Sequence, residues 1–181
     1  MNVKITLMPC ASVPQYARPG DSGFDLVAQE DYVVEPGATV LVRTGIALEL
    51  PEGYEVQVRP RSGVTLWTKL RVNLGTIDAG FRGEIGVIVD NIAQVEYDTE
   101  RDYETNAVTA VEVAQSGSAG TLDGSYVLGY FPQGTYIIRK GERIAQAVIA
   151  PVSRANFVVV AELSETERGS GAFGHTGVNA E

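Results

Sequence analysis

The sequence predicts an all-β protein, and two observations support this fold class. Short runs rich in Val, Ile, Leu and aromatic residues are separated by Gly-, Pro- and Asp-rich turn signals at intervals of about 8–12 residues. Helical periodicity is almost absent, and residues 64–69 are the one segment that could form a short helix. This pattern is typical of a β-sandwich, a jelly roll or a distorted β-barrel.

The first half of the chain is a series of expected strands joined by turns. Residues 1–8 alternate apolar and polar side chains, which indicates a strand, and residues 14–23 are rich in Pro, Gly and Asp, which indicates a loop. The next strands are expected at residues 24–28, 32–34, 39–43, 45–50 and 54–58. Turns are expected at residues 35–37 and 51–53, which contain Pro and Gly.

Residues 71–89 form the stretch around which the chain is organised. Two β-type runs, residues 71–74 and 85–89, flank a polar, glycine-rich centre. This centre carries an acid, an aromatic ring and a guanidinium group: Asp78, Phe81 and Arg82. We expect a β-hairpin whose glycines let the backbone approach a ligand closely. The alternative is an ordinary hairpin with a polar turn, because Gly and Asp are common turn residues.

The character of the chain changes at residues 92–134, which we interpret as an inserted subdomain or extended hairpin. An acidic segment, a strand, a small-residue loop and a second strand are expected at residues 96–104, 107–114, 115–124 and 126–131. Strands then resume at residues 135–139, 143–152 and 157–161, followed by a charged linker at 162–167. The glycine-rich residues 168–181 are expected to be a disordered end or a flexible lid that orders over a ligand.

Composition limits the classes of function. The 181 residues fit one domain with an elaboration, and an apolar fraction of 44% is enough for a hydrophobic core. A net charge of −9 argues against nucleic-acid binding, so local arginines or a metal cation would have to capture an anionic substrate. No run approaches the roughly 18 apolar residues of a membrane span. We therefore expect a soluble, cytoplasmic protein that binds neither membranes nor nucleic acid.

Cysteine and histidine, two residue types that often carry chemistry, occur once each. Cys10 excludes an intramolecular disulfide and is expected to be buried as a small apolar residue. His175 excludes a metal site with two histidines within one chain, and a Ser-His-Asp triad could form only through it.

Five polar, glycine-bearing segments interrupt the β framework and together suggest a phosphate site. They are residues 17–26, 59–64, 73–83, 140–146 and 168–177. Arg61 and Arg168 can form charge-assisted bonds to phosphate oxygens. Ser62, the Gly63 amide and Gln146 offer further donors. Each arginine could also be an ordinary surface charge, and Gln146 could face solvent.

Asp25 and Asp78 are the two acids in apolar or glycine-rich settings. One could act as a general base, and the other could orient an arginine or bind the water shell of Mg²⁺, which takes few protein ligands. Either could instead cap a turn.

The ordered set of these segments resembles the homotrimeric all-β dUTP pyrophosphatases (dUTPases), a family with five sequence motifs. The matching segments read ARPGDSGFDL, RPRSGV, GTIDAGFRG, KGERIAQ and RGSGAFGHTG, at residues 17–26, 59–64, 75–83, 140–146 and 168–177. The resemblance implies a distorted β-barrel or jelly-roll core at residues 1–91 and 135–167, assembled as a trimer with shared active sites. It also implies Mg²⁺-dependent hydrolysis of dUTP to dUMP and pyrophosphate, which removes dUTP and supplies a dTTP precursor.

The resemblance assigns roles at matching positions. Asp78 would be the general base that activates water for attack on the α-phosphorus. Phe81, where the family usually has Tyr, would pack on the deoxyribose and leave no room for a ribose hydroxyl. The main chain of the hairpin would read uracil at Val72, Asn73, Gly75 and Ile77.

Three motifs would bind the phosphates. The residues implied are Arg61, Ser62, Gly63, Gln146 and, on the γ-phosphate, Arg168. Asp25 would orient the arginines or the water shell of Mg²⁺, which the triphosphate itself would chelate. Phe173 would stack over uracil, and Gly174, His175 and Thr176 would close on the phosphates. In this family the hairpin, the phosphate motifs and the tail come from different subunits, so the site would require a trimer.

The sequence departs from the family beyond Phe81. Ala172 and His175 replace the usual Gly and Ser of the fifth motif, so lid closure would be altered and, through the histidine, pH-dependent. Residues 92–134 replace a short connection; they are either a tolerated surface insertion or a platform for a protein partner or a further trimer contact. The interface candidates are Tyr97, Tyr103, Tyr126 and Tyr130. Similar insertions occur in phage dUTPases, which makes a phage origin, and a bacterial host cytoplasm, one interpretation.

Two alternatives to this hydrolase stay open. A dCTP deaminase of the same fold would use a glutamate and generally lacks the Phe-containing fifth motif, so Asp78 and Phe173 favour hydrolysis of dUTP. A nucleotide-gated binding protein, whose tail switches its affinity for a partner, is favoured by the insert alone and need not exclude activity.

Overall fold

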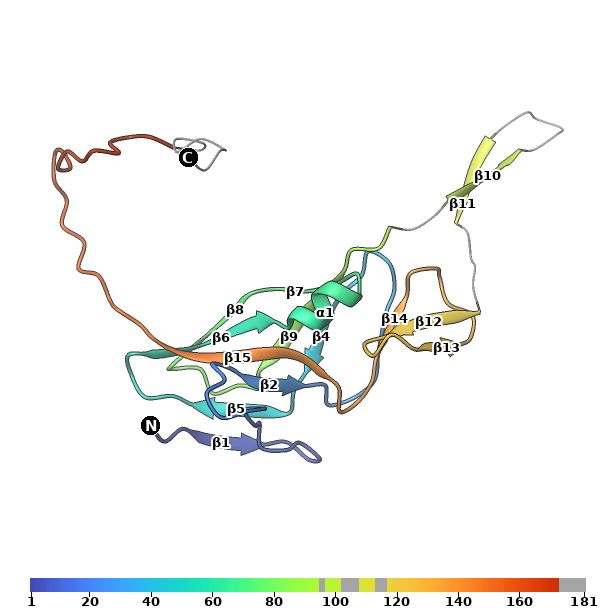
Figure 1. Ribbon diagram of the computed structural model, residues 1–181, viewed down its shortest axis with the longest axis horizontal. Coiled ribbons are helices and arrows are strands. Elements are labelled where there is room, and N and C mark those ends of the chain that lie inside the picture. The colour runs from blue at the N-terminus through green and yellow to red at the C-terminus, as the bar shows by residue number, and fades with distance from the viewer. Residues whose placement is uncertain (95–96, 102–107, 113–116, 173–181) are drawn as a thin grey trace.

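The all-β prediction is confirmed by the computed structural model, which describes residues 1–94, 97–101, 108–112 and 117–172 (Figure 1). In these residues the regular structure is almost entirely short strands, and the one helix is α1 (Ser62–Trp67), close to the segment expected to be helical. No helix in this described part is long and apolar enough to cross a membrane.

Four antiparallel strands form the sheet that carries most of the expected site. Their order is β2 (Phe24–Val27), β15 (Arg143–Pro151), β6 (Tyr54–Pro60) and β8 (Gly75–Asp78). The long strand β15 pairs with β2 on one side and with β6 on the other, and β6 pairs with β8. Segments of the first, fourth, second and third motifs therefore follow one another across a single sheet.

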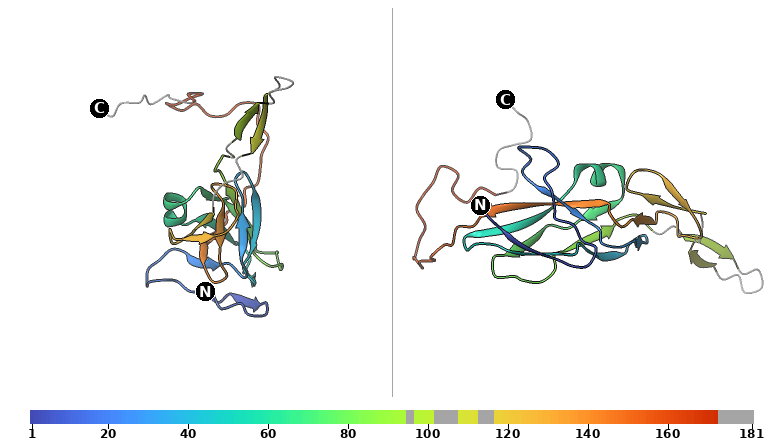
Figure 2. Two further views of the ribbon diagram at one scale, coloured as in Figure 1. Left: turned by 90° about the vertical axis from the view of Figure 1, so that its right-hand side faces the viewer. Right: turned by 90° about the horizontal axis from the view of Figure 1, so that it is seen from below.

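The remaining strands form smaller sheets. One contains β4 (Thr39–Arg43), β9 (Gly86–Asn91) and β7 (Leu70–Val72) in that order. Another contains β13 (Tyr126–Leu128), β12 (Ser118–Thr121), β14 (Tyr136–Ile138) and β3 (Tyr32–Val34). Two pairs complete the fold: β1 (Lys4–Leu7) with β5 (Ile46–Glu49), and β10 (Tyr97–Arg101) with β11 (Val108–Glu112). The β10–β11 pair extends away from the body in the views of Figure 1 and Figure 2.

The core is built by alternation along the strands. On β6, Val56 and Val58 are buried, and Glu55, Gln57 and Arg59 lie on the opposite face. The other fully buried large side chains come from several sheets and include Leu26, Val34, Val42, Leu70, Ile85, Val87 and Ile144. Because each contributes about 1.5–3 kcal/mol on burial, a shift of β6 by one residue is strongly disfavoured. The core thereby fixes the position of the residues that follow β6.

The expectation that residues 71–89 form one hairpin is confirmed for its two flanking runs, which pair antiparallel as β7 and β9, and is wrong for its centre. Strand β7 pairs with β9, whereas β8, which lies between them in the sequence, pairs with β6 in a different sheet. The stretch therefore crosses from one sheet to the other and back. The local pattern indicated strands, but a strand's partner depends on residues far away in the sequence.

Three further expectations are wrong. Residues 157–161, expected as the last strand, form no strand, and Phe157 and Val159 are 91% and 97% exposed. Cys10 is exposed and has a φ of 66°, so it occupies a tight bend instead of the core. Residues 115–124, expected as a loop, contain strand β12.

The boundaries of the insert stay a prediction. Strand β12 pairs in parallel with β14, and β14 pairs with β3 of the first half of the chain. Ala119 of β12 is fully buried. Residues 118–121 thus share a sheet with the framework, whereas β10 and β11 pair with each other.

Candidate active site

Asp25 is the centre of a charged cluster at one end of the four-stranded sheet. On β2 it lies opposite Gln146 of β15, which in turn lies opposite Arg59 of β6. Its Oδ1 forms an ion pair with Nε of Arg61 at 3.2 Å, and its Oδ2 accepts a hydrogen bond from Nη1 of Arg143 at 3.2 Å. Two guanidinium groups share one carboxylate that is only 17% exposed. The cluster therefore has an excess positive charge that suits an anionic ligand.

Backbone oxygens hold these side chains in place. Nη1 of Arg61 donates to the carbonyl oxygen of Arg143 at 2.8 Å, and Nε2 of Gln146 donates to that of Pro60 at 3.0 Å. A Cβ at Gly23 would lie 3.1 Å from Oε1 of Gln146, so a larger residue would crowd the amide. The donors are thus fixed before a ligand binds.

Ser62 and Gly63 directly follow Arg61 and begin helix α1. Both are exposed, whereas Val64 is buried. No side chain in the described part of the chain caps this helix at Arg61, which leaves the first-turn N–H groups without a side-chain acceptor. The structure thus brings together five residues selected from the sequence: Asp25, Arg61, Ser62, Gly63 and Gln146.

Arg143 belongs to this cluster although the sequence pattern does not select it. Simple alternation would put residues 143 and 146 on opposite faces of β15. The pairing of β15 with β2 shifts register between Arg143 and Ala145, and this irregularity allows Arg143 to reach Asp25. Asp25 and Arg143 also line a cavity of about 630 Å³, together with Lys140 and the loop of residues 12–17. The only sequence signal that could have selected Arg143 is its position in the fourth motif.

Asp78 ends strand β8 and begins a tight turn. The N–H of Phe81 donates to the carbonyl oxygen of Asp78 at 3.0 Å, and Nη1 of Arg82 donates to the carbonyl oxygens of Ala79 and Phe81 at 2.6 and 2.8 Å. Both Asp78 and Phe81 are exposed. A Cβ at Gly83 would lie 2.5 Å from Cζ of Phe81, so the ring lies directly against this glycine. The turn therefore carries an exposed carboxylate and an exposed aromatic ring close together in the sequence.

A hollow of about 280 Å³ lies beside the ring of Phe81. It is lined by Leu41, Arg43, Ile77, Phe81, Glu84, Gly86 and Ile88. A Cβ at Gly86 would lie 2.6 Å from Cδ1 of Leu41, so only glycine fits there without displacement. Of these seven lining residues, only Ile77 and Phe81 are predicted site residues. Leu41 and Ile88 have the sequence pattern of ordinary strand residues, and only the pairing of β4 with β9 brings them together.

The backbone expected to read uracil is held from two sheets. The N–H of Asn73 donates to the carbonyl oxygen of Ile88 at 3.0 Å, and its Nδ2 donates to Oδ2 of Asp90 at 3.0 Å. The Thr39 hydroxyl and the Asn73 amide hold the pKa of Asp90 below its usual value. Val72, directly before Asn73, is buried.

On the other side of this stretch, Gly75 lies opposite Val58 on β6, where a Cβ would approach the valine to 3.3 Å. The four residues Val72, Asn73, Gly75 and Ile77 therefore lie on a fixed path.

Asp78 and the Asp25 cluster do not meet within one chain. Asp78 lies opposite Glu55 near the start of β6, and Arg61 follows the end of that strand. Arg61 lies six positions beyond Glu55 along an extended chain, which corresponds to about 20 Å. In addition, Arg61 bonds to Asp25 on β2, and β2 and β8 are the two edges of the sheet.

The tail begins far from both groups of residues. Beyond β15 the chain runs away from the body as an extended segment (Figure 1). Arg168 is exposed, and its Nε donates to the carbonyl oxygen of Gly171 at 3.0 Å. The remaining candidates of the fifth motif lie outside the described residues: Phe173, Gly174, His175 and Thr176.

The donor groups bear on whether a metal ion can be held. The described residues contain no group of three or more His, Cys, Asp or Glu side chains arranged to bind a metal ion. Both oxygens of Asp25 are already paired with arginines. These residues would therefore leave a Mg²⁺ ion to its water and phosphate ligands, which is the coordination this ion prefers.

These features define a class: an all-β protein equipped to bind a phosphate-bearing ligand and to present an acid to it. The dUTPase family model matches residues 10–101 and 127–177, and the chain belongs to the dUTPase family. The unmatched internal residues, 102–126, fall within the expected insert.

Full-length relatives agree with this assignment. The chain is 38% identical to a deoxyuridine 5'-triphosphate nucleotidohydrolase of Clostridium tetani over 169 residues, covering 92% of this chain and 90% of the relative. It is 39% identical to the enzyme of the same name from Chlamydia caviae, covering 98% and 99%.

Among solved structures, the dUTPase of Staphylococcus bacteriophage 80alpha with dUPNHPP is 31% identical, with a TM-score of 0.83 and coverage of 98% and 99%. The dUTPase of phage phi11 of S. aureus, in which a species-specific insert was visualised, is 26% identical, with a TM-score of 0.77 and coverage of 92% and 100%. A variant of the phi11 enzyme coordinates a structural Mg(II) ion.

Proposed function

We propose that this dUTPase hydrolyses dUTP to dUMP and pyrophosphate, in active sites that are shared between the subunits of a homotrimer. The bacterial relatives carry the name of this activity, and the phage 80alpha enzyme was solved with dUPNHPP. The five motifs and the fold support the same activity for this chain.

The separation of Asp78 from Arg61 carries the proposal of a shared site. A triphosphate held by the Asp25–Arg61–Gln146 cluster cannot present its α-phosphorus to Asp78 of the same chain, which lies about 20 Å away along the sheet. Both groups are open to the surface. A second copy of the chain can therefore bring its own Asp78 against the phosphate cluster of the first.

The C-terminal arm, residues 152–167, supports an exchange of segments between subunits. It is exposed throughout and contains a strand-type apolar run. Its large apolar side chains are Val152, Phe157, Val158, Val159, Val160 and Leu163. Such a run is unfavourable in water and gains stability when a neighbouring subunit covers it. An arm placed on a neighbour would also carry Arg168 and the fifth motif to that neighbour's site.

The chemistry assigned to Asp78 is general-base catalysis. Its carboxylate takes a proton from water while the water oxygen bonds to the α-phosphorus, and the bond from that phosphorus to the bridging oxygen breaks, releasing pyrophosphate. Arg61, Ser62, Gly63 and Gln146 bind the phosphates, and Asp25 orients Arg61 through its ion pair. Mg²⁺ carried by the triphosphate would neutralise charge on the phosphates.

Selection of the substrate is assigned to the segment from Val72 to Phe81. Its main chain reads uracil, because a fixed backbone leaves a cytosine amino group without a partner. Phe81 packs against the sugar and excludes a 2′-hydroxyl. The rigid path between β9 and β6 supports this assignment.

A second role, binding of a protein partner through residues 92–134, is supported by the surface of the insert. Tyr126, Leu128 and Tyr130 are large and exposed, and Tyr126 lines one groove together with Trp67 of α1. The 80alpha dUTPase controls transfer of virulence genes by a G protein-like mechanism. A comparable regulatory role here would add to hydrolysis and need not replace it.

One experiment tests the proposed activity. The protein is incubated with dUTP, dCTP, dTTP or UTP and Mg²⁺, and the products are separated. Formation of dUMP and pyrophosphate from dUTP alone supports the proposal. Release of ammonia from dCTP would support the deaminase instead, and tight binding of dUTP without turnover would support a purely regulatory protein.

A further inference from the structure

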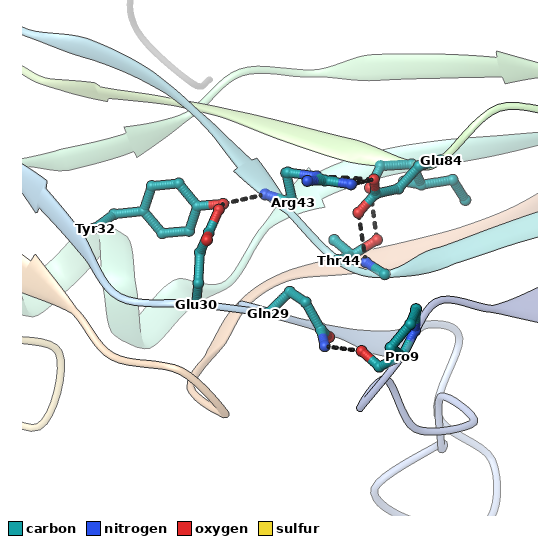
Figure 3. A network of polar contacts seen from close by, with 9 residues as sticks. Pro9, Gln29, Glu30, Tyr32, Arg43, Thr44 and Glu84 are labelled. Carbon is teal, nitrogen blue, oxygen red and sulfur yellow. Dashed lines mark hydrogen bonds and ion pairs between the residues drawn. The ribbon is translucent and has the colours of Figure 1, made fainter.

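The turn that carries Asp78 and Phe81 is tied to the neighbouring strands by the carboxylate of Glu84. Oε2 of Glu84 accepts from Nε and Nη2 of Arg43 at 2.9 and 2.6 Å, and Oε1 accepts from the backbone N–H of Gly45 at 2.8 Å (Figure 3). The Glu84 side chain is only 16% exposed. Three N–H donors thus satisfy the largely buried carboxylate of Glu84 and fix its orientation relative to Arg43 and Gly45.

Arg43 is itself anchored to the framework. Its backbone N–H donates to the hydroxyl oxygen of Tyr32 at 2.9 Å, and that hydroxyl donates to Oε1 of Glu30 at 3.0 Å (Figure 3). Its carbonyl oxygen accepts from the N–H of Gln29 at 2.9 Å. The guanidinium group therefore extends from a strand end that is fixed by its neighbours.

Among the described residues, the other hydrogen bonds of the turn are internal to it. Phe81 donates to Asp78, and Arg82 donates to Ala79 and Phe81. After Glu84, the N–H of Ile85 donates to the carbonyl oxygen of Ile46 at 2.8 Å. Glu84 is thus the residue at which the turn first becomes joined to β4 and β5.

The same pair lies beside the ring that selects the sugar. Arg43, Glu84 and Phe81 line one hollow, and Phe81 rests against Gly83, the residue before Glu84. A change in the position of Glu84 would therefore move the backbone under the ring.

We propose that the Arg43–Glu84 pair is a positioning element for sugar selection. It fixes the turn so that Phe81 stands at the depth that admits deoxyribose and excludes ribose. This inference rests on the proposed function. Without the pair, the turn and its ring shift, and a 2′-hydroxyl then fits beside Phe81. The pair thus affects the choice between dUTP and UTP more than the turnover of dUTP.

The test compares kcat/KM for dUTP with that for UTP. In Glu84→Gln and in Arg43→Gln the ratio should fall about tenfold. The double variant should lose no more than either single variant, because the two residues act as one unit. Arg43→Lys, which keeps the charge and loses the fork, should show a smaller fall. The matched control is Lys4→Gln, which removes the exposed Lys4–Glu49 ion pair of 2.8 Å and should leave the ratio unchanged.

Two results would overturn the inference. One is an unchanged ratio of the kcat/KM values for dUTP and UTP in both single variants. If these variants do not fold, an unchanged ratio in Arg43→Lys is the contradicting result. The other is an equal fall in Ile138→Val, a core change on β14 that lowers stability without touching the turn. A wild-type protein that does not hydrolyse dUTP would instead refute the proposed function, before any variant is compared.

Discussion

Asp78 and Arg61 are held near opposite ends of the same strand pair. The β6–β8 ladder places Asp78 against Glu55, and Arg61 follows Pro60, the last residue of β6. The core valines Val56 and Val58 between these ends prevent a change of register. In the proposed mechanism, Asp78 and the phosphate cluster of one chain therefore belong to two different sites.

Mixing two inactive variants tests this arrangement. Asp78→Asn keeps an intact phosphate cluster, and Arg61→Ala keeps an intact acid. When equal amounts are unfolded together and reassembled, about one quarter of wild-type activity should return, because each mixed trimer has one site with both native residues. Each variant refolded alone is the control. No recovery in the mixture would mean that both residues act within one chain.

Asp78→Asn should lower kcat by at least about 100-fold, because the amide cannot accept a proton from water. Binding of dUTP should be nearly unchanged, since Asp78 is exposed at a turn and separate from the phosphate cluster. Calorimetric titration with dUTP and a product assay measure the two quantities. Wild-type turnover in this variant would remove Asp78 from the mechanism.

Phe81→Ala should raise kcat/KM for UTP relative to dUTP, because the smaller residue leaves room for a 2′-hydroxyl beside Gly83. Phe81→Tyr is the matched control, since it keeps the ring. The ratio of kcat/KM for UTP to kcat/KM for dUTP is measured in each variant. Equal discrimination in Ala and Tyr variants would contradict a role of the ring in sugar selection.

Glu84 should make stability depend on pH in the acid range. Its ordinary pKa is 4.5, and the hydrogen bond from the Arg43 guanidinium holds the pKa below that value in the folded protein. A lowered folded pKa contributes stability that is fully present above pH 4.5 and is lost as the pH falls through the folded pKa. Glu84→Gln should therefore lower Tm at neutral pH and have a smaller effect near pH 3.

Thermal unfolding between about pH 3 and about pH 7 checks this prediction. Glu49→Gln serves as the comparison, because its exposed pair with Lys4 should contribute little at any pH. A constant Tm difference across the range would show that the Glu84 effect is not electrostatic.

Deletion of residues 168–181 should reduce turnover of dUTP strongly and leave Tm unchanged. In the described part of the tail, Arg168 donates to Gly171 within the tail itself. The deletion therefore removes no strand that the structure describes, whereas the fifth motif is lost. Product assays and thermal unfolding separate the two effects, and unimpaired turnover would exclude a lid role for these residues.

Sequence reasoning was most successful where one strand face is buried. The alternation of Val56 and Val58 with Glu55 and Gln57 indicated β6 directly. It failed where the presence of a pairing strand decides whether a segment becomes a strand. Residues 157–161 have a strand composition, yet no described strand pairs with them, and composition carries no information about where a partner is.

In the candidate site, too, contacts that depend on strand pairing could not be predicted from the sequence. Motif order selected Asp25, Arg61 and Gln146, and the structure places them in one cluster. Arg143 was not selected because a register irregularity on β15, invisible in the sequence, allows it to reach Asp25. Glu84 reads as an ordinary surface acid until the pairing of β4 with β9 brings Arg43 to it.

The exposed C-terminal arm has a consequence for the amount of working enzyme in a cell. If neighbouring subunits cover Phe157, Val159 and Leu163, the last part of the fold forms only when chains associate. Assembly then follows mass action, and at low expression activity rises more steeply than in proportion to the number of chains. Removal of dUTP would therefore begin above a threshold of synthesis, and dilution of the purified enzyme would abolish activity before it unfolds the individual chain.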